Sequence, residues 1–172
     1  MPSLLIRELE SEDAESYLQL RREALLNAPL AFASSPSDDR CASAGAVCEY
    51  LGGAPMRVII GAFQPELIGA VGLYRDAALK ASHKAHLWGM YVSASHRREG
   101  VASALLDAAL RHARTFAGVT CVQLGVTSAA PEAKRLYECA GFVVWGTEPE
   151  ALCQAGETVV EYHMVLRLAR SV

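Results

Sequence analysis

The chain has 172 residues, of which 52% are hydrophobic and 20% charged, and its formal net charge is −3. This length predicts a single domain over residues 1–172, and the apolar content excludes a disordered chain. No apolar run approaches the roughly 18 residues of a membrane helix, and the net acidic charge argues against general nucleic-acid binding.

The first half of the chain predicts a strand, a helix and a hairpin. Residues 4–6 alternate as a strand does, and the acidic segment 11–13 is typical of a helix cap. Residues 27–53 are rich in Ser, Ala, Gly and Asp, which predicts an irregular or short-helical excursion of the kind that shapes a substrate pocket. Two apolar, β-branched runs at 57–63 and 67–74 predict an antiparallel hairpin.

The middle of the chain predicts a strand, a tight turn and a helix. Residues 85–92 form a third apolar run. In residues 100–116 the apolar side chains recur at spacings of four and three, which predicts a helix with one buried stripe. A further strand is predicted at 119–126.

The last quarter of the chain predicts one helix and two strands. Pro131 suits the first position of a helix, and Gly141 suits the residue that follows its last turn. Strands are predicted at 142–145 and 158–168. Together these elements predict an α/β fold with a mixed sheet, with no internal repeat and no second domain.

The turn ahead of the helix at 100–116 has the chemistry of an anion site. Free backbone N–H groups and the helix dipole favour an anion there, and Gly100 allows close approach of the backbone. Small residues, Ala102 and Ser103, follow, and Arg97 and Arg98 add positive charge. Neither a Rossmann fingerprint nor a P-loop is present. Taken alone, the segment is explained as well by a glycine turn with two solvated arginines.

Three motifs in order give this turn a more specific interpretation. Arg97, Gly100 and Ala102 fit the pattern [Q/R]-x-x-G-x-[G/A], residues 87–92 form a strand ahead of it, and residues 133–142 read A-x-x-L-Y-x-x-x-G-F. Over roughly residues 85–146 the chain resembles the GNAT superfamily of N-acetyltransferases. The resemblance implies an α/β fold with a mixed sheet of about six to seven strands flanked by helices on both faces. It also implies acetyl-CoA as cosubstrate and an amine as acceptor.

The resemblance also implies which residues hold the cofactor. The backbone amides of the turn would bind the CoA pyrophosphate beside the end of the strand. The implied cofactor-binding residues are Met90, Tyr91, Val92, Arg97, Arg98, Glu99, Gly100, Val101, Ala102 and Ser103. One position departs from the family pattern, because Ala130 stands where many members carry an asparagine that contacts the cofactor arm.

Two catalytic roles follow from the same resemblance. Tyr137, at the motif tyrosine, would protonate the departing CoA thiolate, although it also suits a core position on its helix. His86 lies where some relatives carry a strand base, and an imidazole titrates in the useful range, although a structural histidine is the alternative. His83 and His86 form H-x-x-H without a third ligand nearby, so no metal is expected.

The sequence leaves the acceptor open. Glu161, Tyr162 and His163 on the last strand either reach the acceptor pocket or alternate between surface and core. Trp88, with other aromatic residues, serves either packing or recognition. A catalytically silent acyl-CoA-binding module is the alternative function, and a nucleic-acid role for the basic segment 96–98 is disfavoured by its shortness. Monomer and homodimer are both compatible with the sequence.

The cysteines and the N-terminal residues indicate the compartment. The five cysteines form no C-x-x-C pair and leave one thiol unpaired in any disulfide scheme, as reduced thiols do. Residues 1–5 show no basic flank or apolar core of a secretory signal. We therefore expect a cytoplasmic protein.

Overall fold

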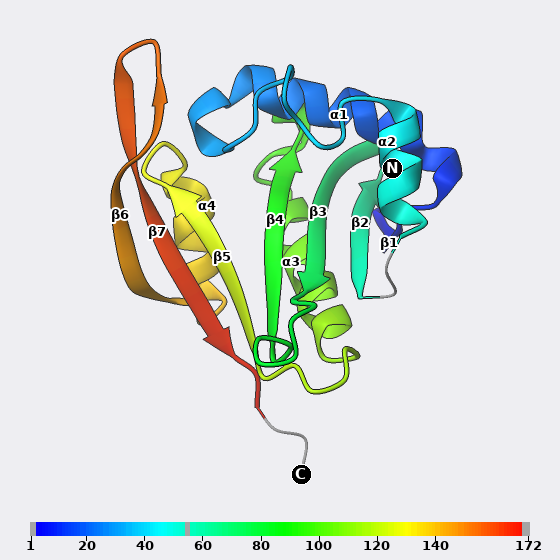
Figure 1. Ribbon diagram of the computed structural model, residues 1–172. Helices are drawn as coiled ribbons and strands as arrows, with labels where there is room; N and C mark the ends of the chain where they lie inside the picture. The colour runs from blue at the N-terminus through cyan, green and yellow to red at the C-terminus, as the bar shows by residue number, and fades with distance from the viewer. Residues whose placement is uncertain (1–2, 54–55, 170–172) are drawn as a thin grey trace.

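A seven-stranded sheet organises the chain in the computed structural model, which describes residues 3–53 and 56–169 (Figure 1). The strand order is β1-β2-β3-β4-β5-β7-β6, with β4 and β5 parallel and every other neighbouring pair antiparallel. The strands are β1 (Leu5–Glu8), β2 (Arg57–Phe63), β3 (Leu67–Arg75), β4 (Lys84–Val92), β5 (Cys121–Thr127), β6 (Val143–Gln154) and β7 (Glu157–Arg167). The helices are α1 (Ala14–Asn27), α2 (Ala44–Leu51), α3 (Val101–Ala113) and α4 (Pro131–Cys139). The predicted mixed sheet is confirmed.

Helices cover both faces of the sheet, as expected. Alternate side chains of a strand point to opposite faces, so β2 contributes to two separate cores. Val58 and Ile60 pack in the cluster that contains α3 and α4, whereas Ile59 packs in the cluster of α1 and α2. Over β5, β7 and β6 the face on the α1 side carries no helix (Figure 1). Among the described residues, no helix has the length and apolar character needed to span a bilayer.

The sheet opens between β4 and β5. Only Lys84–His86 pair with Cys121–Gln123, and beyond these residues the two strands diverge (Figure 1). The register between β3 and β4 shifts at the same level, so Gly89 and Met90 both stand opposite one residue of β3. Gly89 has φ of 63°, which a glycine adopts without steric cost. A bulge of this kind bends its strand, here away from β5.

Two predicted elements differ from the structure in detail. The strand predicted at 142–145 extends to Gln154, because the polar segment beyond Gly146 pairs with β7 although it lacks an apolar alternation. The predicted helix cap at 11–13 forms a short 3-10 turn, and its last residue, Asp13, is the N-cap of α1. There the Asp13 carboxylate accepts the Glu10 N–H at 2.8 Å. The excursion at 27–53 contains a 3-10 turn, Pro29–Ala31, and helix α2.

A buried ion pair fixes this excursion to α1. The Arg21 Nε and Nη2 donate to the two oxygens of Asp39 at 3.1 and 2.9 Å, and both side chains are buried. The Arg21 guanidinium also lies 5.2 Å from the ring centroid of Phe32 and 5.5 Å from that of Trp88. One arginine therefore joins α1, the excursion and β4.

We expect Asp39→Asn to lower the free energy of unfolding by about 3–5 kcal/mol at pH 7, because it leaves the Arg21 charge buried without a counter-charge. Burial raises the pKa of the Asp39 carboxyl, but the bond to Arg21 outweighs burial and holds this pKa below its ordinary value. The stabilisation is therefore present above about pH 4 and is lost as pH falls through the lowered pKa.

Urea unfolding at several pH values measures this difference. The control is Glu15→Gln, which removes an exposed carboxylate of α1, the helix that carries Arg21, and should change stability by no more than about 0.5 kcal/mol. A loss below about 1 kcal/mol for Asp39→Asn at pH 7 would contradict a structural role for the ion pair.

Candidate functional site

The turn before α3 offers free backbone N–H groups to an anion. The helix begins at Val101 after Gly100, whose φ is 81°, and its first hydrogen bond runs from the Ala104 N–H to the Gly100 carbonyl at 3.0 Å. The N–H groups of Val101, Ala102 and Ser103 are therefore not used by the helix and lie at the positive end of its dipole. A Cβ built on Gly100 would meet no atom within 4 Å, so the turn faces open space.

The residues predicted to hold the cofactor lie together at one corner of the molecule. Arg97, Arg98 and Glu99 are exposed on the connection between β4 and α3. The Arg97 Nε donates to the Val92 carbonyl at 3.1 Å, so this side chain leans back over the end of β4. Arg98 has φ of 64°, so the turn contains two residues in the left-handed region, Arg98 and Gly100. A concave run of N–H groups of this kind suits a phosphate.

The side chain of Tyr91 is committed to α1. Its hydroxyl donates to a Glu23 oxygen at 2.9 Å and accepts from the Asn27 amide at 3.4 Å, and the Ser93 hydroxyl donates to the other Glu23 oxygen at 3.3 Å. Burial, together with Glu23, raises the pKa of Tyr91. Only the backbone of Tyr91 is therefore left for a ligand. Sequence reasoning missed Glu23, because nothing local in α1 marks it.

Tyr137 lies in the core on the α3 and α4 side of the sheet. Its ring packs edge-on against Phe142 with centroids 5.8 Å apart, and it shares a buried cluster with Val126 of β5. In the described part of the chain its hydroxyl makes no hydrogen bond. Burial raises the pKa of Tyr137 well above its ordinary value. Its role as the catalytic acid stays a prediction.

His86 lies on the opposite face, where β4 makes its last pairing with β5. Its Nε2 is 2.9 Å from the Asp76 Oδ2, and its ring stacks on Tyr74 with centroids 4.9 Å apart. A carboxylate only accepts hydrogen bonds, so the His86 Nε2 is the donor of this pair. Burial raises the pKa of Asp76, but His86 and Lys84 outweigh burial and hold it below its ordinary value. The sequence did not predict Asp76, because it lies between β3 and β4 and only the pairing of these strands brings it beside His86.

The three candidates on β7 divide between the two faces. Glu161 and His163 lie on the open face, whereas Tyr162 faces α4, where the Lys134 ammonium is 5.1 Å from its ring centroid. The His163 Nε2 is 3.2 Å from a Glu148 oxygen and 4.0 Å from a Glu161 oxygen. Within residues 3–53 and 56–169, these three side chains are the one group of His, Cys, Asp or Glu residues with metal-ligand spacing, all within 4.8 Å of one another.

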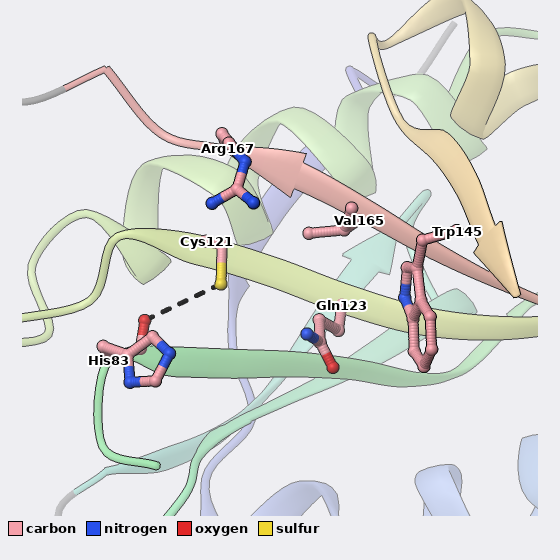
Figure 2. A pocket seen from close by; sticks show the side chains of 6 residues that line it. All are labelled: His83, Cys121, Gln123, Trp145, Val165 and Arg167. Atoms are coloured by element: carbon pink, nitrogen blue, oxygen red, sulfur yellow. Dashed lines mark hydrogen bonds between the residues drawn. The ribbon is translucent and has the colours of Figure 1, made fainter. Parts of the chain in front are cut away.

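A shallow pocket of roughly 300 Å³ lies on the same open face (Figure 2). Its walls come from the start of β4, from β5 and from the terminal strands β6 and β7. It is lined by His83, Cys121, Gln123, Trp145, Val165 and Arg167. His83 therefore lines this pocket, whereas His86 bonds Asp76.

Comparison with known proteins places the chain among acetyltransferases. Residues 9–142 match the model of the acetyltransferase (GNAT) family. Among solved structures, a GNAT acetyltransferase from Streptococcus pneumoniae superposes with a TM-score of 0.83 at 22% identity, covering 96% of this chain and 100% of that one. YncA, a putative acetyltransferase from Salmonella typhimurium solved with its cofactor acetyl-CoA, gives 0.81 at 19% identity over 99% and 96%. NAA60 from Arabidopsis thaliana, solved with a bisubstrate analogue, gives 0.74 at 18% identity over 96% and 98%. No curated protein matches the chain.

Proposed function

Because this chain belongs to the acetyltransferase (GNAT) family, we propose that it transfers the acetyl group of acetyl-CoA to the nitrogen of a primary amine. The observation that carries the proposal is the turn at residues 97–103, whose unused N–H groups face open space beside the end of β4. The acetyl-CoA in the Salmonella structure supports this assignment by analogy. A silent acyl-CoA-binding module is the alternative, and the presence of Tyr137 at the motif position of the acid favours the enzyme.

The proposed cofactor site relies on backbone groups. The N–H groups of Val101, Ala102 and Ser103 would bind the pyrophosphate, with Arg97 and Arg98 adding positive charge. Beyond His86 the edge of β4 that faces β5 is not paired with that strand. Its backbone groups can therefore bind the pantetheine arm and polarise the thioester carbonyl. Ala130 adds no polar contact, because its methyl group packs against the core.

Proton transfers on either side of the opening complete the proposed reaction. The His86 Nδ1 accepts the proton of the acceptor ammonium, directly or through water, while Asp76 holds the ring through Nε2. The neutral amine attacks the thioester carbonyl and the C–S bond breaks. The Tyr137 phenol gives its proton to the CoA thiolate, and the attacking nitrogen loses its second proton, which restores the phenol of Tyr137. Acetyl-CoA supplies the activated acyl group.

We expect wild-type protein to release CoA thiol with at least one amine of a panel, and Gly100→Glu to abolish both release and acetyl-CoA binding. The glutamate would project into the space where the phosphates bind and repel them. The matched control is Gly118→Glu, since Gly118 has φ of 79° and equally open surroundings at the other end of α3. Calorimetry should show unchanged acetyl-CoA affinity for the control. Unchanged affinity in a folded Gly100→Glu protein would mean that the phosphates bind elsewhere.

We expect Tyr137→Phe to lower kcat by about 10²- to 10⁴-fold while acetyl-CoA affinity changes little, because the hydroxyl is needed only when the thiolate leaves. The phenylalanine ring retains the contact with Phe142, and the hydroxyl makes no hydrogen bond within the described residues, so stability should be retained. Single-turnover kinetics with the best amine of the panel measure the chemical step. An unchanged chemical rate would restrict Tyr137 to a role in the core.

We expect His86→Ala to depress turnover most near neutral pH and to recover toward wild type at alkaline pH, where more of the acceptor amine is already neutral. Asp76→Asn should produce a smaller change in the same direction, since it removes the group that orients the imidazole. The pH dependence of turnover is measured together with the melting temperature of each variant. A stable His86→Ala protein with an unshifted pH profile would rule out His86 as the base.

A further inference from the structure

We propose that the acceptor is an extended molecule with a primary amine at one end and an anionic group, a carboxylate or a phosphate, at the other end. The inference rests on the proposed function and names the substrate class of that site. Its binding surface is the open face of β5, β6 and β7 (Figures 1 and 2). The register of these strands fixes the order of charges along that face.

The amine end of the surface lies beside the opening of the sheet. Gly125 is the first residue of β5 on this face beyond the last pairing with β4, at Gln123. The Glu161 carboxylate lies over Gly125, in the space that a side chain at that position would fill. Glu148 pairs across the strands with Glu161, and one histidine, His163, lies between the two carboxylates. This end therefore carries net negative charge and attracts an ammonium group.

The anionic end lies at the Cys121 end of β5, opposite Arg167 of β7. Along β7 the side chains on this face follow the order Glu161, His163, Val165 and Arg167, and Arg167 pairs with Cys121. Gly125 lies four residue steps beyond Cys121 on β5, a span of about 13 Å at about 3.3 Å per residue. Arg167 is exposed and makes no ion pair within the described residues. Its charge is therefore free to bind a carboxylate or a phosphate.

The two ends belong to one continuous surface. Trp145 and Val165 line the pocket between them, and the Trp145 ring contacts His163 with centroids 5.5 Å apart. Trp145 is 60% exposed, which leaves an apolar platform for the middle of a ligand. At the far end the Thr127 hydroxyl donates to the Leu30 carbonyl at 2.7 Å, so the excursion closes the surface there. Along β5, a ligand with its amine at the opening therefore extends toward Arg167.

The test measures kcat/KM for ω-amino carboxylates of four to ten carbons, for alkylamines of matched length, and for an ω-amino alkyl phosphate. We expect the best amino carboxylate or amino phosphate to exceed its matched alkylamine by about 10- to 100-fold, the range of one charge-assisted contact. Arg167→Gln should bring this ratio close to one. Glu161→Gln should lower kcat/KM for all these amines, because the contact to the ammonium is common to them.

The control variant is Arg111→Gln, which removes an exposed arginine of α3 on the other side of the sheet and should leave the ratio unchanged. The carboxylate and phosphate arms decide which anion the site prefers. Alkylamines acetylated as fast as their anionic counterparts would overturn the inference and leave the proposed function standing. Acetyl-CoA binding without CoA release for any amine would overturn the proposed function, and this inference with it.

Discussion

The separation of β4 from β5 is the constraint on which the rest of the molecule depends. A parallel pair that stayed hydrogen-bonded along its length would use the backbone groups that a ligand needs. Here the pairing stops at His86 and Gln123, and the bulge at Gly89 turns β4 away. The edge of β4 that is not paired with β5 then leads to the N–H groups of the turn at Gly100. On the proposed function, the binding path for acetyl-CoA is thus built mainly from backbone.

The opening also joins the two faces of the sheet. Tyr137 approaches from the α3 and α4 side, where burial keeps its phenol protonated, and His86 lies on the other side with its ring held by Asp76. The proposed acid and the proposed base therefore stand on opposite faces of the sheet. On the proposed function, cofactor and acceptor therefore meet in the opening from opposite sides.

The buried side chain of Arg21 packs against the bulge at Gly89 from the α1 side of the sheet. The Arg21 Nη1 is buried without a hydrogen-bond partner among the described residues, and it lies 3.3 Å from the position that a Cβ on Gly89 would occupy. Gly89 therefore serves two needs, since it adopts a positive φ and leaves room for the guanidinium. An unpartnered buried donor costs about 1–3 kcal/mol, which the bidentate pairing with Asp39 offsets. Side chains from α1 and the excursion thus help to hold the geometry of β4.

Local pattern determined much of this protein. The helix from Pro131 to Cys139, with Gly141 after its last turn, and the glycine turn before α3 follow from short-range rules of φ and capping, so the sequence alone predicts them. The tertiary structure decided the pairs between distant segments: Asp76 beside His86, Glu23 beside Tyr91, and the charge order along β7. Such pairs depend on strand register and on the route of the excursion, and no spacing within one element encodes them. The motifs that indicate the family are local, so the sequence was enough to predict it. The charges of the open face come from paired strands, so the proposed class of amine depends on the tertiary structure.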